Sequence, residues 1–304
     1  MEKTDTNKIS KVYFIDKVNK DRLVELYNAV GRKLQGKIAV KLHTGEHDRL
    51  YNLQPDFIKP LVDYLKGTIV ECNTAYEGRR DTTEEHWKVI QSHGYPTVAK
   101  CDIMDEFGQI ELPVPNGKQI KKNFVGKNLA NYDSILVFSH FKGHIMGGFG
   151  GAMKNTSIGI ASRYGKEYIH GAGVPEHKWV CDQDKFLESM ADAVKSVMEY
   201  KKDKMVFINV MKDMSIDCDS FPHTPEFDDI GMLASLDPVA LDQACVDKVY
   251  QDPNVKGTRT LRQRMEDMHA IHILETGVEL GIGTRKYELI DLSKKQLFKE
   301  IKDK

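Results

Sequence analysis

The chain has 304 residues, of which 40% are hydrophobic and 29% charged, so it can bury one large core or two moderate ones. Lys and Arg number 44 against 45 Asp and Glu. This balance gives no overall positive electrostatic potential that would attract nucleic acid or an anionic membrane. The first residues lack the apolar core of a signal peptide, and no apolar run is long enough to cross a bilayer. A cytoplasmic protein with no membrane partner is therefore expected.

The five cysteines are scattered and never stand as Cys-x-x-Cys. That arrangement argues against a disulfide framework, a zinc knuckle and an iron–sulfur cluster, so free thiols are expected. Aromatic and basic residues do not interleave in the way that nucleic-acid platforms require, and nucleic-acid binding is not expected.

Short β-rich runs alternate with helical patterns, which predicts an α/β fold with mostly parallel sheets and flanking helices. In the first half, strands are expected at 11–16, 37–42, 68–71 and 98–103, and helices at about 21–34, 55–65 and 82–93. In the second half, strands are expected at 134–138, 205–210, 230–234 and 287–292, and helices at about 186–197, 238–250, 261–280 and in the Lys-rich tail. Asp182 or Asp184 is the expected cap of the helix at 186–197.

Residues 107–126 interrupt the alternation with Gly, Pro and Lys, and they suit an edge hairpin or an exposed excursion. The whole chain, 1–304, is interpreted as one domain. A weakly marked boundary near residue 130 divides it into an amino-terminal α/β lobe, 1–130, and a carboxyl-terminal lobe, 131–304. A cleft is expected between the two lobes.

The segment from Ser139 to Asn155 is the most informative part of the chain, because five glycines, two histidines and two lysines directly follow an apolar strand. Glycines let backbone N–H groups gather into a concave site for an anion. In open α/β sheets, ligands bind outside the carboxyl ends of strands, where this segment begins. The residues predicted to bind an anionic ligand or cofactor here are Lys142, Gly147, Gly148, Gly150, Gly151 and Asn155.

His144 and Lys154 flank the glycines, and a turning loop can bring both into one cavity with apolar walls. Lys154 can hold a carboxylate or phosphate by charge, while His144, helped by His170 or His140, can move a proton. The alternative is a glycine-rich connection that carries surface cations. His170 is by itself also compatible with a hydrogen-bonded structural role.

Two further loops follow predicted strands and carry charged side chains. His43 and Glu46 follow the strand at 37–42, and Arg79 and Arg80 follow the strand at 68–71. The carboxyl ends of parallel strands meet at one rim, so these side chains are expected near the glycine-rich segment. The alternative for the two arginines is that they only solvate the approach to a helix.

An acidic turn after the strand at 205–210 contains Cys218, Asp219 and His223. Together with His144 and His170, Cys218 and Asp219 can ligate a divalent metal, although the spacing matches no standard zinc or calcium loop. A turn held by local hydrogen bonds is equally compatible with the sequence.

At these loops the chain resembles the family called domain of unknown function 362, whose members are often labelled uncharacterised iron–sulfur centre proteins. The resemblance rests on Lys41-x-His-x-Gly-Glu46, Tyr76-x-Gly-x-Arg80 with His86 and His93-Gly94, the segment Ser139 to Asn155, and Asp229 to Ala244. The family's ferredoxin-like insertion would fall between His170 and Phe186, where this chain has only 15 residues and one cysteine. Its Cys-Asp-Cys turn reads Cys218-Asp219-Ser220 here.

A second resemblance, to the nickel-pincer lactate racemase superfamily, concerns the glycine-rich segment. His144, Lys154 and His170 stand where that superfamily has a histidine before a glycine-rich turn, a lysine that bears the cofactor and a later histidine. It implies a two-domain α/β enzyme that handles a small carboxylate or an anchored organic cofactor in a cleft at the domain interface.

Three functional hypotheses follow. The first is an enzyme with redox or isomerase chemistry that binds a small anionic substrate or cofactor. The second is a metal-binding protein that uses His144, His170 and the Cys218 turn. The third is a non-catalytic anion sensor or the partner of a separate redox protein. The sequence leaves the substrate, the cofactor and the oligomeric state open.

Overall fold

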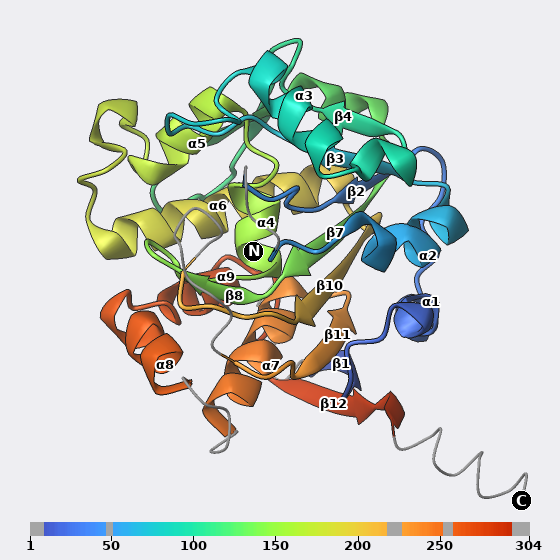
Figure 1. Cartoon of the computed structure of the whole chain (residues 1–304). Coiled ribbons are helices and arrows are strands. Elements are labelled where there is room, and N and C mark those ends of the chain that lie inside the picture. Colours follow the sequence, from blue (N-terminus) through green and yellow to red (C-terminus); the bar gives the residue numbers. More distant parts are fainter. Residues whose placement is uncertain (1–8, 47–50, 218–226, 252–257, 294–304) are drawn as a thin grey trace, which may run out of the picture.

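A computed structural model describes residues 9–46, 51–217, 227–251 and 258–293. Its main sheet has eight strands in the order β12-β1-β11-β10-β7-β2-β3-β4 (Figure 1). The strands are β1 (Ser10–Ile15), β2 (Ile38–Lys41), β3 (Thr68–Glu71), β4 (Cys101–Ile103), β7 (Ser134–His140), β10 (Met205–Met211), β11 (Gly231–Ser235) and β12 (Tyr287–Asp291). Two hairpins are separate from this sheet: β5 (Gln109–Pro113) with β6 (Lys122–Gly126), and β8 (Lys142–His144) with β9 (Gly148–Gly150).

The main sheet is mostly parallel, as expected, since only β11 runs antiparallel to its two neighbours, β1 and β10. The central strands β7, β10 and β11 are buried at every residue. Helices cover both faces of a parallel sheet, and its inner strands therefore consist of continuous apolar runs. This is why these runs could be recognised in the sequence.

Helices pack on both faces of the sheet. One face carries α1 (Leu23–Ala29), α2 (Pro55–Leu65) and α3 (Thr83–Ser92), and the other carries α4 (Ala152–Ser157), α6 (Gln183–Lys201), α7 (Pro238–Gln251) and α9 (His272–Glu279). Successive residues of β7 point to opposite faces: Leu136 and Phe138 join the first core, and Ile135 and Val137 join the second. Two further helices are α5 (Arg163–His170) and α8 (Thr258–Asp267), and single 3₁₀ turns lie at Lys20–Arg22, Tyr95–Thr97, Lys127–Asn131 and Pro175–His177.

Several local predictions are confirmed, and one helix differs. The interruption at 107–126 contains the predicted hairpin, and the Asp182 side chain caps α6 by accepting a hydrogen bond from the Lys185 amide. The single helix expected at 261–280 is wrong: α8 and α9 are separate because the chain turns at His269, whose φ is +48°. The predicted tail helix lies outside the described residues.

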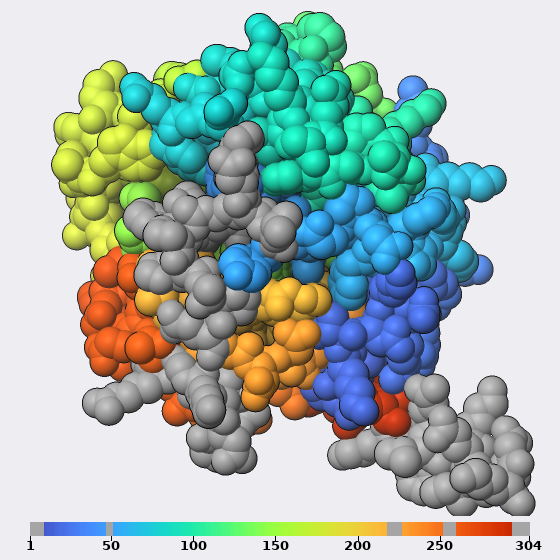
Figure 2. Space-filling view, in the orientation of Figure 1, coloured from blue at the N-terminus to red at the C-terminus, as the bar shows by residue number. Residues whose placement is uncertain are grey.

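Strands from both predicted lobes belong to the same sheet, because β2 pairs with β7 across the expected boundary near residue 130. The amino-terminal β1 likewise pairs with β11, and Figure 2 shows dark blue amino-terminal residues beside orange carboxyl-terminal ones. The division into two lobes stays a prediction. Within the described ranges, no helix has the length and apolar character needed to cross a membrane.

Asp192 attaches the loop between β5 and β6 to α6. Its buried carboxylate accepts hydrogen bonds from the amides of Lys118, Gln119 and Ile120 at 2.8, 2.7 and 2.9 Å. An unsatisfied buried donor costs about 1–3 kcal/mol, so we expect Asp192→Ala to lower the free energy of unfolding by about 3–5 kcal/mol. Urea denaturation measures this difference.

The matched control is Glu199→Ala on the same helix, where an exposed carboxylate contacts Lys195. Exposed pairs contribute about 0–1 kcal/mol, so the control should change little. Equal effects of the two substitutions would contradict the anchoring role of Asp192.

Candidate functional site

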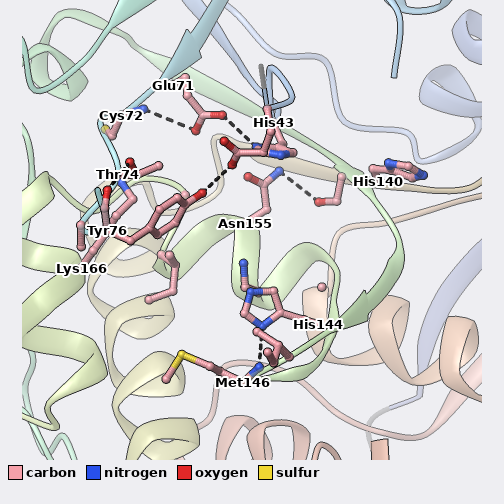
Figure 3. Close-up of a pocket in the computed structure, with 18 of the residues that line it drawn as sticks. His43, Glu71, Cys72, Thr74, Tyr76, His140, His144, Met146, Asn155 and Lys166 are labelled. Carbon is pink, nitrogen blue, oxygen red and sulfur yellow. Dashed lines mark hydrogen bonds and ion pairs between the residues drawn. The ribbon is translucent and has the colours of Figure 1, made fainter. Parts of the chain in front are cut away.

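A cavity of about 460 Å³ lies at the carboxyl ends of β2, β3 and β7 (Figure 3). The chain leaves β2 toward β3 on one side, whereas β7 leads to β10 on the other side. Such a reversal of strand order opens a crevice in which α/β proteins bind ligands. The volume falls within the usual range for small-molecule sites, about 300–1,000 Å³.

The predicted site residues converge on this cavity from three loops and two helices. Those that line it are His43, Glu46, Arg80, His140, Lys142, His144, Gly150, Gly151, Lys154, Asn155 and His170. His43 and Glu46 follow β2, Arg80 follows β3, and Lys154 stands on α4. The loops after β2, β3 and β7 therefore meet at one edge of the sheet, as expected.

Other predicted residues lie elsewhere. Gly147 and Gly148 do not line the cavity, and Arg79 is exposed and pairs with Glu85 at 3.7 Å. Cys218 and Asp219 lie outside the described residues. Among the described residues, no cluster of three or more His, Cys, Asp or Glu side chains is arranged to hold a metal ion.

Four backbone amides of the glycine-rich segment are bound within the protein, and one of them belongs to a glycine of the expected nest, Gly147. The amides of Met146 and Gly147 both donate to Nδ1 of His144, at 3.1 and 3.0 Å. The amides of Ala152 and Met153 both donate to the buried carboxylate of Asp242, at 2.7 and 2.9 Å. Protein acceptors occupy these four donors, so these four amides are not available to an anion, and the role predicted for Gly150 and Gly151 at the cavity stays a prediction.

Close packing explains two of the glycines. Gly148 has a φ of +73°, and a Cβ there would lie 2.4 Å from the Cβ of Ala270. A Cβ on Gly151 would lie 2.4 Å from Oδ1 of Asp242. These positions require glycine because the hairpin β8–β9 and the start of α4 pack tightly against other elements.

A buried charged network forms the wall at the ends of β2 and β3. Lys41 donates to Oε1 of Glu71 at 2.6 Å, and the other carboxylate oxygen accepts from the Thr44 amide at 3.1 Å. Arg80 lies 3.6 Å from Glu71 and also pairs with Glu46, to which the Tyr76 hydroxyl donates. Burial alone would raise the pKa of Glu71, but Lys41 and the other neighbouring cations hold it well below its usual range.

Sequence reasoning missed the acidic partner in this wall. Glu71 is the last residue of an apolar strand, and Lys41 ends the neighbouring strand. Charged residues at the ends of two adjacent buried strands were the available signal. Lys166 and Trp179, which also line the cavity, carried no comparable signal because they lie within a helix and an irregular segment.

Asn155 connects α4 to the strand ends. Its side-chain nitrogen lies within hydrogen-bond distance of the carbonyl oxygens of Lys41 and Phe138, both at 3.2 Å, and of the Ser139 hydroxyl at 3.1 Å. Its oxygen accepts from Nζ of Lys41 at 3.0 Å. The side-chain amide thus links the start of α4 to the ends of β2 and β7, and the ligand-binding role predicted for Asn155 stays a prediction.

His170 projects from the end of α5 and is held in one tautomer. Its Nδ1–H donates to the carbonyl oxygen of Lys166 at 2.7 Å, which leaves the lone pair on Nε2. The ring stacks on Phe186, with centroids 4.8 Å apart, and meets the edge of Trp179 at 5.4 Å. Burial lowers the pKa of His170 to about 4, so the ring is neutral at pH 7.

His140 ends β7 and also lines the cavity. Its Nε2–H donates to the carbonyl oxygen of Lys212, which ties this ring to the end of β10. Figure 3 shows His140 set apart from His144. This contact fixes the tautomer of the ring, and the proton-transfer role predicted from the sequence stays a prediction.

His86 lies behind the charged wall and makes stability depend on pH. Its ring contacts Asn73 at 3.1 Å, and burial lowers its pKa to about 3. The unfolded chain binds a proton near pH 6.5 and the folded chain does not, so this contribution is complete above pH 6.5 and declines as the pH falls toward 3.

We expect the stability advantage of the wild type over His86→Gln to shrink by about 2.5 kcal/mol between pH 7 and pH 4.5. Groups with opposite behaviour, such as Asp242 with a pKa that burial raises to about 6, cancel in this difference. Urea denaturation of both proteins across the range measures it. A difference independent of pH would show that His86 binds its proton equally well in the folded and the unfolded chain.

The sheet order and the cavity define an α/β protein with a small-molecule-sized cavity at its topological switch point. The chain belongs to the family described as Domain of unknown function (DUF362), whose sequence model matches residues 38–247. This confirms the first resemblance. A comparison with curated proteins found no match.

Among solved structures, two similar chains are the lactate racemase apoprotein from Thermoanaerobacterium thermosaccharolyticum and a Thermotoga maritima protein determined by a structural genomics consortium. The first has a TM-score of 0.41 and 13% identity, and the match covers 69% of this chain and 52% of that one. The second has a TM-score of 0.43 and 13% identity, and covers 86% and 57%. The chain thus spans a little over half the length of each.

Proposed function

We propose that the cavity is the active site of an enzyme that binds a small anionic substrate and transfers a proton, in the manner of an isomerase or racemase. The observation that carries this proposal is the lone pair on Nε2 of His170 in a cavity lined by several cations. Among the described lining residues, the cationic side chains are Lys41, Arg80, Lys142, Lys154 and Lys166, and the carboxylates are Glu46 and Glu71.

This charge distribution favours an anion whose negative charge increases during the reaction. Lys154 would hold a carboxylate group of the substrate, and His170 would remove a proton from the adjacent carbon at Nε2. The C–H electron pair stays on that carbon as a carbanion, which the nearby ammonium groups stabilise. Burial disfavours the imidazolium form of His170, so the proton is readily returned.

An anchored organic cofactor is compatible with the same residues. Lys154 and His170 would hold it: the lysine has the amine that anchoring needs, and Nε2 of His170 has the lone pair that a metal or an electrophilic centre needs. Such a group would accept electrons from the substrate carbon.

Exchange with solvent tests the proposal. The protein is incubated in D₂O with short 2-hydroxy, 2-amino and unsubstituted carboxylates, and loss of the proton on the carbon beside the carboxylate is followed by ¹H NMR. We expect exchange with at least one of these classes and its loss in His170→Gln. His177→Gln, on an exposed histidine in the turn after α5, is the matched control and should behave as wild type.

Saturable binding without exchange by the wild type would contradict proton transfer and would favour the non-catalytic sensor. Metal analysis of protein purified without a histidine tag addresses the metal-binding alternative. A stoichiometric metal that His170→Gln loses would favour that alternative.

A further inference from the structure

His144 lies at the floor of the cavity, on the hairpin β8–β9. Two backbone amides, those of Met146 and Gly147, converge on its Nδ1 at 3.1 and 3.0 Å. A backbone N–H can only donate, so Nδ1 must accept, and the proton of a neutral imidazole must then be on Nε2. Figure 3 shows one ring nitrogen facing Met146 and the other facing the side on which Asn155 lies.

Two effects oppose the protonation of this ring: the amide hydrogens at Nδ1 and the positive charges nearby. A hydrogen on Nδ1 would point at the two amide hydrogens. The surrounding groups add to this effect: the pKa of His144 lies well below its usual range because the ring is buried and because Lys154, His170 and Lys142 are nearby. Glu46 and Glu71 are the carboxylates of the described cavity lining, and both pair with other cations.

We propose that His144 is a permanent Nε2–H donor that binds an oxygen atom of the anionic ligand, and that it serves neither as the base nor as a metal ligand. This inference rests on the proposed function only in that an anion occupies the cavity. Accepting a proton or a metal at Nε2 needs a lone pair there, and the two amides prevent it.

Two of the histidines that line the cavity, His144 and His170, therefore have complementary forms. His170 donates from Nδ1 and presents a lone pair, whereas His144 accepts at Nδ1 and presents an N–H. The ligand class that suits this pair has a hydrogen-bond-accepting oxygen, such as a carboxylate or a carbonyl oxygen beside a carboxylate. As charge develops on that oxygen, a neutral N–H stabilises it without transferring its proton.

The tautomer can be measured directly. Two-bond ¹H–¹⁵N correlation spectra of protein with ¹⁵N-labelled histidine report which ring nitrogen carries the proton, and the His144 signals are those missing in His144→Gln. We expect an Nε2–H tautomer with no titration between pH 5.5 and 8. An Nδ1–H tautomer, or an imidazolium that forms in this range, would overturn the proposal.

Two substitutions separate donation from basicity. His144→Gln keeps an N–H donor at a similar reach but has no ring lone pair, and His144→Leu has neither. Binding of oxalate is followed by the fluorescence of Trp179, which lines the cavity, in a Trp87→Phe background. We expect the Kd to rise less than about threefold in His144→Gln and more than about tenfold in His144→Leu.

Equal weakening by both substitutions would contradict the donor role. Failure of the proposed function gives a different result. In that case His170→Gln leaves the rate of solvent exchange unchanged, and the tautomer of His144 is still measured from the NMR spectrum. If oxalate does not bind to the parent protein, the proposed anion site fails and the tautomer measurement alone decides the inference.

Discussion

Replacing Asp242 with Ala is expected to lower the free energy of unfolding by about 3–5 kcal/mol and to abolish anion binding in the cavity. The buried carboxylate of Asp242 accepts from the amides of Ala152 and Met153 and from Nδ2 of Asn209 at 2.7 Å. Each donor left unsatisfied costs about 1–3 kcal/mol. The same contacts hold the start of α4, so their loss also displaces Lys154.

Urea denaturation and anion titration of the same preparation measure both effects. Asp203→Ala, at an exposed carboxylate after α6, is the control and should change stability by less than about 0.5 kcal/mol. A stable Asp242→Ala protein with normal anion binding would show that α4 keeps its position without this anchor.

Breaking the Lys41–Glu71 pair is expected to have the second large effect. Both side chains are almost fully buried, with exposed fractions of 1% and 4%, and removal of one partner leaves the other charge uncompensated. We expect Lys41→Met and Glu71→Gln each to lower the free energy of unfolding by about 3–5 kcal/mol. The double variant should lose less than the sum of the two single losses.

The surface pair of Lys59 and Asp63 on α2 is the matched control, since its atoms are also 2.6 Å apart but its side chains are about half exposed. Lys59→Met should cost at most about 1 kcal/mol. Additive losses in the Lys41–Glu71 cycle would contradict a direct coupling between these residues.

The sequence was sufficient for the sheet because its central strands are continuous apolar runs between turn signals, as at 134–140 and 205–211. It also placed His43, Arg80 and His144 near one another, because strand ends in a parallel sheet share a rim. These arguments need only local patterns and the known geometry of parallel strands.

The missed features depend on contacts between distant segments. Asp242 is about 90 positions from the amides that it binds, and nothing local to Ala152 indicates that those amides are occupied. The helix expected at 261–280 has no Gly or Pro at the break, because the turn occurs at His269. The tautomer of His144 depends on how the backbone of the hairpin folds back, which residue types alone do not specify.

A fluorescence titration with small anions shows whether the cavity binds an anion through Lys154. The chain has two tryptophans, so Trp87→Phe leaves Trp179 as the only indole, at the cavity and beside His170. Its fluorescence is titrated with acetate, oxalate and inorganic phosphate. We expect a saturable change that Lys154→Ala removes and that Lys33→Ala, at an exposed lysine, preserves. A flat response to all three anions, or equal binding by the Lys154→Ala protein, would contradict anion binding through Lys154.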